Sequence, residues 1–554
     1  MTYLSFKNFF SAHKVEIQEN KKSLVRATWF LACASVISNI LGLLRDRIFV
    51  SIFGAGNALD AYYVAFRIPD LIFNLLVLGA LFSAFIPVFT DYITRKENKE
   101  AWHVANSLIN IFTFGLLVIS GLAFLVAPYL TYLIAPGFAQ NPEKMQLAIN
   151  LTRLMLVTPI IFSLSNIFSG ILNSFKRFIA YALTPIVYNL GIIFGALYLS
   201  KFYGIYSLAY GVIIGASLHL LIQVPSVLTC GYRYRATLDF LHEGVRRIAK
   251  LMIPTAVALG ISQISLVVYT ILGSTLRAGS IAIINLANNI QTFPTVVFGI
   301  SIATTIFPTL AEKASLEQTK DFVKDFSWAN RQILFLIIPS TAGIIILRAQ
   351  IIRLILGAAK FTWSDTQLAA ATLGFFALSL VAQATIPVLA RSFYALKNTK
   401  TPLLAGFLAA TVNVILAYIL AYRVFGYQWG VAGLALAFSI ASFIQAIILW
   451  ILLRREIGSL DEKNILISVF KVIFASLIMA TAVYGTLYLV APLVNMQKFF
   501  GILTQTLIAM AVGIFVYFIV ALLLKCPEIS VVRKLIRMRI KNSPSIGTIF
   551  LPIS

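Results

Sequence analysis

The chain has 554 residues, of which 60% are hydrophobic and only 12% are charged, and its mean hydropathy is +0.90. Lys and Arg outnumber Asp and Glu by 44 to 20, which gives a net charge of +24. This composition leaves little room for a soluble domain. It therefore argues against a soluble enzyme, and against a nucleic-acid-binding protein, which needs a basic domain outside the membrane.

Nearly the whole chain consists of apolar runs long enough to cross a bilayer, for which a helix needs roughly 20 apolar residues. The first run is too long for a removable signal peptide and has no small-residue cleavage site. We predict an all-α polytopic membrane protein with about fourteen spans. In chain order they are 28–52, 61–92, 105–134, 147–172, 179–199, 206–228, 251–275, 281–310, 332–356, 367–390, 403–422, 430–453, 466–491 and 499–524.

The basic residues predict how these spans cross the membrane. Of the 44 Lys and Arg residues, 32 belong to the two chain ends and the even-numbered loops and eight belong to the odd-numbered loops, where Arg348, Arg353 and Lys471, which lie toward span ends, are counted with the adjoining loops. The other four lie inside spans. Because cytoplasmic loops are enriched in Lys and Arg, both termini and the even-numbered loops are predicted to be cytoplasmic. The basic balance also favours contact with anionic membrane lipids.

The chain also repeats itself, which divides it into lobes. Residues 83–87 (Ser-Ala-Phe-Ile-Pro) resemble residues 304–308 (Thr-Thr-Ile-Phe-Pro) at an offset of 221 residues, and each motif precedes a charged loop and a long apolar run. Six spans per half insert the same way up, which predicts a parallel repeat about an axis along the membrane normal. The predicted organisation is a cytoplasmic tail (1–27), an N-lobe (28–228), a cytoplasmic linker (229–250), a C-lobe (251–453), two added helices (454–525) and a basic cytoplasmic tail (526–554).

Charged residues inside the first two spans are the first candidates for a site, because an ionisable group in hydrocarbon usually faces a cavity or a partner. Arg45 is the best placed cation for an anionic substrate. The alternative is that Arg45 and Asp46 mark a helix end and pair with each other or with lipid headgroups. Asp60 and Arg67, like Asp46, are expected to be structural or gating residues rather than substrate ligands.

Prolines inside the second and eighth spans predict bends in those helices. Pro69 and Pro87 lie in the second span, and Pro294 and Pro308 lie in the eighth. Proline removes one backbone hydrogen bond and kinks a helix. Two such helices in matching places suggest the bending elements of an alternating-access transporter, and a static kink is the alternative.

The sequence indicates no bound cofactor or metal. The four His and three Cys residues have no metal-ligand spacing, and no phosphate-binding loop is present. No Asp or Glu lies in the apolar runs from the seventh span to the twelfth, so a proton relay there lacks a carboxylate. Coupling to a sodium gradient through neutral oxygens and coupling to the membrane potential both stay open.

Several motifs resemble the MurJ/MviN family of lipid II flippases, over almost the whole length of the chain. The matching segments are Leu-Gly-Leu-Leu-Arg-Asp at 41–46, Phe-Gly-Ala-Gly at 53–56, Asp-Ala at 60–61, Ala-Pro-Gly-Phe at 135–138, Ile-Leu-Asn at 171–173, Gly-Ile-Ser-Gln-Ile-Ser at 260–265, Phe-Pro at 293–294, Phe-Tyr-Ala at 393–395 and Lys-Thr-Pro at 400–402. The resemblance implies the fold of the multidrug/oligosaccharidyl-lipid/polysaccharide exporter superfamily. Two six-helix lobes would then form a V around a cationic cavity, and two added helices would form a groove for the lipid tail.

The function that the resemblance implies is transport without bond chemistry. The partner would be lipid II, an undecaprenyl-pyrophosphate carrying a disaccharide-pentapeptide, moved from the inner to the outer leaflet of the bacterial cytoplasmic membrane. We expect a monomer that contacts membrane lipids and binds no nucleic acid. An enzyme is not indicated, because no nucleophile–base pair stands out in a plausible cavity.

The chain departs from the family pattern at the cavity. The family usually carries several arginines there, and Arg45 matches one of them. Asn39 and Asn289 stand where two others are expected, Phe73-Asn74 stands where a third is expected, and Leu78 replaces an acidic residue. The candidate substrate-binding residues are therefore Arg45, Asn39 and Asn289. The alternative function is that of a diverged member, which exports another lipid-linked glycan or amphiphile or has become an accessory protein without transport.

Overall fold

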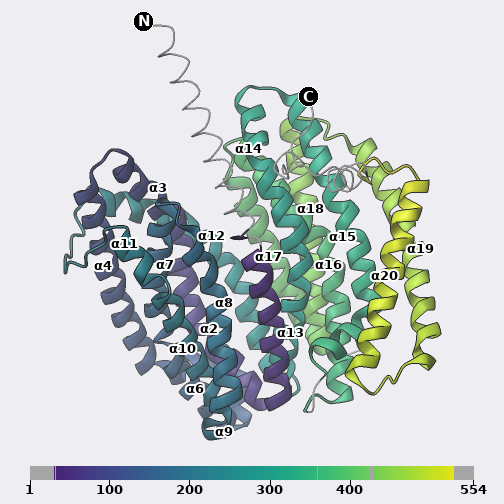
Figure 1. The fold of residues 1–554 in the computed structure, drawn as a ribbon, viewed down its shortest axis with the longest axis horizontal. Helices are drawn as coiled ribbons and strands as arrows, with labels where there is room; N and C mark the ends of the chain where they lie inside the picture. Colours follow the sequence, from purple (N-terminus) through teal and green to yellow (C-terminus); the bar gives the residue numbers. More distant parts are fainter. Residues whose placement is uncertain (1–29, 32, 358–359, 423–428, 530–554) are drawn as a thin grey trace, which may run out of the picture. The chain divides into compact units, whose positions relative to one another are not determined.

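The computed structural model describes residues 30–31, 33–357, 360–422 and 429–529, and these are nearly all helical, with no β-strand among them (Figure 1). Within this part of the chain, eleven helices are long and apolar enough to cross a membrane. The prediction of an all-α polytopic membrane protein is confirmed. The expected tail at 1–27 and most of the basic tail at 526–554 lie outside the described residues.

The helices follow the predicted runs in order. After a helix that reaches residue 53, they are α2 (Asn57–Phe73), α3 (Gly79–Thr94), α4 (Asn98–Leu125), α5 (Ala127–Ile134), α6 (Pro142–Met155), α7 (Thr158–Ser174), α8 (Phe178–Phe194), α9 (Ser200–Tyr203), α10 (Tyr206–Leu221), α11 (Val224–Thr229), α12 (Glu243–Ser274), α13 (Ser280–Pro294), α14 (Ser301–Ser315), α15 (Thr319–Ile355), α16 (Trp363–Ala395), α17 (Lys400–Ala421), α18 (Gly430–Ile457), α19 (Glu462–Val490) and α20 (Phe499–Leu523).

Two boundaries differ from the sequence prediction. The run predicted as 105–134 is divided at Val126 into α4 and α5, because Pro128 has no N–H to continue the helical hydrogen bonds. Helix α12 begins at Glu243, inside the predicted linker 229–250.

The runs at 28–52, 61–92 and 251–275 are not among the eleven candidate spans, although they are helical where described. A total of fourteen spans is consistent with this result and stays a prediction.

Contacts divide the chain into two compact units. The first contains the described residues up to Arg45 together with Ile68–Pro128 and Ile149–Leu259, and the second contains Asp46–Arg67, Tyr129–Ala148 and the described residues from Gly260 onward. Aromatic side chains such as Phe85 and Phe89 fill the core of the first unit, and Phe326 and Phe393 those of the second. The division by contact thus differs from the lobes predicted from the repeat, which remain a prediction.

Three π-helical segments interrupt the described helices, Asn74–Leu78, Gly195–Leu199 and Thr295–Ile300, and the first and the third are related by the repeat. Asn74–Leu78 follows α2, and Thr295–Ile300 follows α13, so the two segments begin at the same offset of 221 residues that the motifs predicted. Pro87 and Pro308 lie inside α3 and α14 at that offset as well. Pro69 and Pro294 lie inside α2 and α13, one helical turn out of register. Each half therefore carries a π segment between two proline-containing helices, a feature that often occurs at functional sites.

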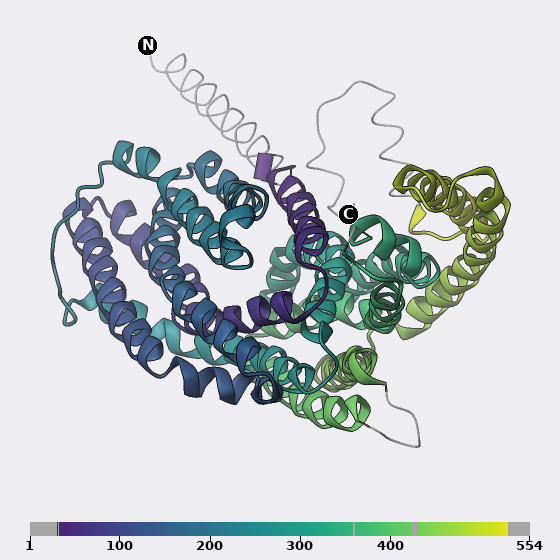
Figure 2. The same ribbon diagram turned by 90° about the horizontal axis from the view of Figure 1, so that it is seen from below.

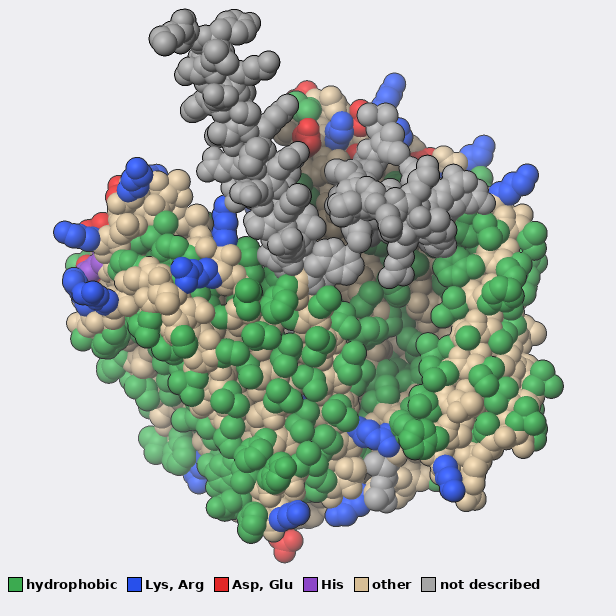
Figure 3. Space-filling model, in the orientation of Figure 1, with side chains coloured by type: hydrophobic (Ala, Val, Ile, Leu, Met, Phe, Trp, Pro, Cys, Tyr) green, Lys and Arg blue, Asp and Glu red, His purple; other side chains and the backbone are tan. Residues whose placement is uncertain are grey.

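The two added helices belong to the second unit. Helices α19 and α20 pack on each other and on α15, around Phe335, Val472 and Tyr517 (Figures 1 and 2). The Tyr517 hydroxyl donates a hydrogen bond of 2.6 Å to the Phe335 carbonyl. Hydrophobic side chains cover the middle of the face shown in Figure 3, while Lys and Arg gather toward its two edges. This pattern is the one expected of a surface that contacts lipid.

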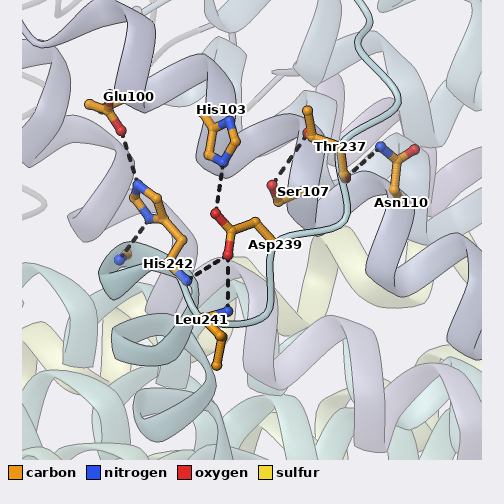
Figure 4. Close-up of polar contacts among 9 residues, drawn as sticks. Glu100, His103, Ser107, Asn110, Thr237, Asp239, Leu241 and His242 are labelled. Atoms are coloured by element: carbon orange, nitrogen blue, oxygen red, sulfur yellow. Dashed lines mark hydrogen bonds and ion pairs between the residues drawn. The ribbon is translucent and has the colours of Figure 1, made fainter.

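One face of α4 binds the segment that leads into α12 (Figure 4). Asn110 donates to the carbonyls of Arg235 and Thr237 at 3.0 and 2.9 Å, and His103 contacts Asp239 at 3.1 Å. The ring of His242 accepts from the Gly244 N–H at Nδ1, so its Nε2–H donates to Glu100, 3.0 Å away. These α4 side chains recur every three or four residues and so lie on one face. They fix residues 235–242 of the predicted linker.

This segment should loosen in acid. The hydrogen bond from His103 holds the pKa of Asp239 below its usual value, and the N–H groups of Leu241 and His242 act in the same direction. The stabilisation is therefore present above about pH 4, the usual pKa of an aspartate, and is lost as the pH falls through the lower pKa of the folded state. Hydrogen exchange should show protection factors at 236–242 that collapse in this acid range.

The variant Asp239→Ala should show low protection at neutral pH as well, whereas Asp321→Ala, which removes an exposed carboxylate from α15, should behave like the wild type. Equal protection in Asp239→Ala and wild type at neutral pH would contradict this role for Asp239.

Candidate functional site

Arg45, the main predicted substrate ligand, lies in the interior of a helix. The helix continues for eight more residues to Phe53, so the alternative that Arg45 and Asp46 mark a helix end is wrong. The guanidinium donates a hydrogen bond of 3.3 Å to Asn189 of α8, and the Asn189 amide in turn contacts the Ser38 hydroxyl at 3.3 Å. Arg45 is half-buried and thus held by neighbours of its own unit, which orients a cation before any ligand arrives.

The other two candidate ligands are both exposed. Asn39 lies on the same helix as Arg45, one and two-thirds turns earlier. Asn289 lies on α13, where its amide donates a hydrogen bond of 2.9 Å to buried Asp46. An asparagine side chain carries no charge to offset that carboxylate, whereas the arginine expected at position 289 would form an ion pair with it. No observation tests a role in substrate binding, which stays a prediction for all three residues.

Arg67 is buried among polar side chains of the second unit. Its guanidinium donates to the Thr270 hydroxyl at 2.8 Å and to the Asn285 amide oxygen at 2.6 Å. These bonds connect α2 with α12 and α13. The arrangement fits the structural role that the sequence analysis favoured, because the hydrogen bonds are made to neighbouring helices and Arg67 is only 7% exposed.

Asp60 joins three segments of the second unit, which we call the Asp60 cluster: residues 54–60, 136–144 and 274–282. The carboxylate accepts hydrogen bonds from the N–H groups of Gly279 and Ala282, at 2.7 and 2.9 Å, and so caps the N-terminus of α13. It also forms an ion pair of 2.9 Å with the ammonium of Lys144. Both partners are buried, and Lys144 lies 4.0 Å from the centre of the Phe138 ring. The acceptor for these two N–H groups thus comes from a distant part of the sequence.

Two glycines allow these segments to approach each other. Gly279 has a φ of +87°, a conformation that favours glycine, and a Cβ there would overlap the Ala55 carbonyl. A Cβ on Gly137 would overlap the backbone of Ser274, and the Gly137 N–H donates to the Ser274 hydroxyl at 3.0 Å. The motifs at 53–56, 60–61 and 135–138 therefore meet in one structural cluster. Sequence alone placed Asp60 near a loop but gave no sign of its partners.

The neutral polar residues in the second half mostly bind one another. Gln383 donates to Gln291 at 3.0 Å, and Gln291 donates to Asn288 at 3.0 Å. Asn413 accepts from the Tyr269 hydroxyl at 2.9 Å and donates to Ser265 at 3.0 Å. In the described part of the chain, no group of three or more His, Cys, Asp or Glu side chains is arranged to hold a metal ion. The network supports helix packing first of all.

Sequence analysis missed a buried network in the first unit. Ser165 contacts the ring of His219 at 2.6 Å, and the Gln223 amide donates to the Ser165 hydroxyl at 2.7 Å. Ser169 donates to Gln223 at 2.8 Å. The members of each pair, Ser165 with Ser169 and His219 with Gln223, are four residues apart and so lie on one face of a helix. This spacing is the feature of the sequence from which the network could have been predicted.

Breaking the Asp60 cluster should destabilise the protein strongly. Asp60→Ala leaves the Lys144 ammonium buried without a counter-charge, and losing one partner of a buried ion pair costs about 3–5 kcal/mol. The double variant Asp60→Ala with Lys144→Met should recover part of that loss, because the buried charge is gone. The thermal unfolding midpoint of each purified variant in detergent measures the loss and its partial recovery. Glu143→Ala, which removes an exposed neighbouring carboxylate, is the control and should leave the midpoint unchanged. A double variant no more stable than Asp60→Ala would contradict the ion-pair explanation.

The sequence of this chain is similar to those of known lipid II flippases over most of its length. The family model described as "Lipid II flippase MurJ" matches residues 49–505. A probable lipid II flippase MurJ from Buchnera aphidicola subsp. Acyrthosiphon pisum (strain APS) is 30% identical over 472 residues, which is 85% of this chain and 91% of the relative. A probable lipid II flippase MurJ from Bdellovibrio bacteriovorus is 28% identical over 526 residues, covering 94% of this chain and 98% of the relative.

Solved structures show the same likeness. A lipid II flippase MurJ in an inward closed conformation matches with a TM-score of 0.74 and 29% identity, over 92% of this chain and 99% of the other. A multidrug transporter of the MATE family in an inward-facing conformation matches with a TM-score of 0.61 and 17% identity, over 76% of this chain and 96% of the other, which is a likeness of fold alone. The helical fold, the motifs of the Asp60 cluster and the match over 49–505 agree: this chain belongs to the lipid II flippase MurJ family.

Proposed function

We propose that this protein is a flippase that moves lipid II from the inner to the outer leaflet of the bacterial cytoplasmic membrane. The observation that carries the proposal is the family match over residues 49–505, which includes both repeat-related π segments and the Asp60 cluster. The substrate is an undecaprenyl-pyrophosphate that carries a disaccharide-pentapeptide. No bond is made or broken, so the protein needs a binding cation and two access states rather than catalytic residues.

Arg45 is the residue that we assign to the pyrophosphate. An arginine binds phosphate oxygens through a fork of charge-assisted hydrogen bonds, and the contact with Asn189 orients the Arg45 guanidinium. The π segments at 74–78 and 295–300, each next to proline-containing helices, are the elements that we expect to bend during alternating access. A broken backbone ladder lowers the cost of bending at these positions.

A second candidate function rests on the missing arginines. Asn39, Phe73 and Asn289 supply no cation, and Phe73 instead packs against Phe162 with ring centres 5.3 Å apart. A pyrophosphate held by fewer arginines binds more weakly, because an asparagine does not replace a guanidinium. A diverged member that carries a less anionic amphiphile, or that has lost transport, would tolerate these residues.

The orientation proposed for the chain follows from its basic residues. Both termini and the loop at 229–250 are assigned to the cytoplasm. We expect a monomer whose transport is driven by the membrane potential or by a monovalent cation gradient. The amide oxygens of the hydrogen-bonded Gln and Asn side chains of α13 and α16 are neutral groups that could coordinate such a cation.

Arg45→Ala should abolish transport while the protein still folds and inserts. Losing a charge-assisted contact of this kind costs about 1.5–3 kcal/mol, or roughly ten- to a hundredfold in affinity. Arg45→Lys keeps the charge without the fork and should retain partial activity. The assay is rescue of bacteria depleted of their own lipid II flippase, with membrane levels of each variant measured in parallel.

Arg153→Ala is the matched control, because Arg153 is also a span arginine of the first unit but binds the Phe124 carbonyl and ring. Equal rescue by wild type and Arg45→Ala would exclude the assigned role of Arg45. Rescue only by a variant that carries Asn39→Arg, Phe73→Arg and Asn289→Arg together would instead support the diverged function.

The orientation predicts which positions a membrane-impermeant thiol reagent reaches. In intact cells, a cysteine introduced at Asn141 should react, because its loop is assigned to the outer side. A cysteine introduced at Tyr234, an exposed residue of the 229–250 loop, should react only after the cells are opened. The reverse pattern would overturn the orientation.

A further inference from the structure

A cavity of about 540 Å³ lies between α15 and α16, toward the ends that the loop at 356–362 connects. Ile345 and Arg348 of α15 line it, as do Trp363, Gly374 and Leu378 of α16. Its other lining residues are small or apolar except for Thr366 and Gln367. The volume is in the range of sites that hold a small ligand, and the lining combines an apolar trough with one cation.

The cavity lies on the face of α16 opposite the one turned toward α13. Asp365 pairs with Arg277 at 2.8 Å, and Gln383 donates to Gln291 of α13 at 3.0 Å, so these two residues mark the face of α16 turned toward α13. Gly374 is nine residues from each of them, which is two and a half turns at 3.6 residues per turn. It therefore lies on the opposite face. Trp363 and Leu378 are 63% and 39% exposed on that side.

The dimensions of the cavity suit one membrane leaflet. From Trp363 to Leu378, α16 rises about 22 Å at 1.5 Å per residue, which is about half of the 40–45 Å thickness of a whole bilayer. Tryptophan is enriched at the membrane–water interface, and Trp363 is the first residue of α16. The cavity lining on α16, which is exposed at Trp363 and at Leu378, thus runs from the interface toward the middle of the bilayer.

Among the residues that the structure describes, Arg348 is the only charged one that lines the cavity, and it is exposed. Its guanidinium donates a hydrogen bond of 2.7 Å to the Ile345 carbonyl, and it forms no ion pair within the described residues. A guanidinium has five N–H donors, so this bond leaves donors for a ligand. A cation at this depth, about 10 Å before the end of α15 by helix rise, is costly unless an anion accompanies it.

We propose that this cavity binds an anionic phospholipid of the leaflet at the 356–362 end, with the lipid phosphate at Arg348 and an acyl chain along Ala371, Gly374 and Leu378. The trough is deep because α16 has small residues there. A Cβ on Gly374 would lie 3.1 Å from Cδ of Arg348, so glycine leaves room for the arginine stem. Under the orientation proposed above, this is the outer leaflet, but the site itself does not depend on lipid II transport.

Trp363 provides a local reporter for the test. The purified full-length protein is reconstituted in phosphatidylcholine vesicles that contain a minor fraction of brominated phosphatidylglycerol or, in a second series, of brominated phosphatidylcholine. Subtracting the fluorescence of Trp363→Phe from that of the wild type isolates Trp363 from the other five tryptophans. Brominated phosphatidylglycerol should quench Trp363 several-fold more strongly than brominated phosphatidylcholine.

Arg348→Gln should remove the preference for the anionic lipid. Ala371→Phe, which keeps the charge and fills the trough, should reduce quenching by both lipids. Lys201→Gln is the matched control, because it removes an exposed cation assigned to the same side of the membrane but far from α15 in sequence. The fluorescence of each variant is compared with that of the same variant carrying Trp363→Phe. A variant that fails to fold is recognised by a changed emission spectrum of its other five tryptophans.

Equal quenching by the two lipids in the wild type, or an unchanged preference in Arg348→Gln, would overturn the proposal. Release of the preference by inorganic phosphate at a concentration equal to that of the lipid would show a free-phosphate site and would also overturn it. Because the test measures lipid contact and not transport, its result is independent of whether the protein flips lipid II.

Discussion

Buried helix ends must find their hydrogen bonds inside the protein, and Asp60 meets this requirement for α13. Where a helix end is buried, no water satisfies a free N–H group, and leaving it unpaired costs about 1–3 kcal/mol. Asp60 supplies two acceptors for the first turn of α13 and a counter-charge for Lys144. The position of α13 within the second unit, and with it the positions of Asn285 and Asn289, depends on this one carboxylate.

The same requirement explains why most polar side chains in the spans are engaged with one another. Arg67 binds Thr270 and Asn285, and Asn413 binds Ser265 and Tyr269. Such contacts hold helices together where no hydrophobic driving force acts between them. The three π segments of the described residues are the exception to this regular pairing, because the helical ladder itself is altered there. Rigid helix contacts with local irregular segments form a suitable framework for a transporter that changes state.

The electrostatics of the candidate site set this chain apart from the pattern of its family. Arg45 is preserved and oriented by Asn189, whereas Asn289 meets Asp46 without a charge of its own. Fewer cations reduce the attraction for a pyrophosphate, so the rest of the substrate would have to contribute more of the binding free energy. The cation Arg348, on the opposite face of α16 from α13, belongs to a different part of the surface and has a different expected ligand.

The sequence by itself determined the features that depend on local composition. Twenty or so apolar residues in a row have one stable solution in a bilayer, and hence the helices, their order and the offset of 221 residues were all predictable. It also identified Arg45, Asp60 and Arg67 as exceptional, because charge in hydrocarbon is costly. Only the tertiary structure decided what these residues do. The Asp60 carboxylate accepts a hydrogen bond from the Ala282 N–H, 222 residues away in the chain. No local sequence pattern predicts such a partner. The π segments and the trough beside Arg348 likewise arise from packing between helices, which depends on side chains that are close in space and distant in the chain.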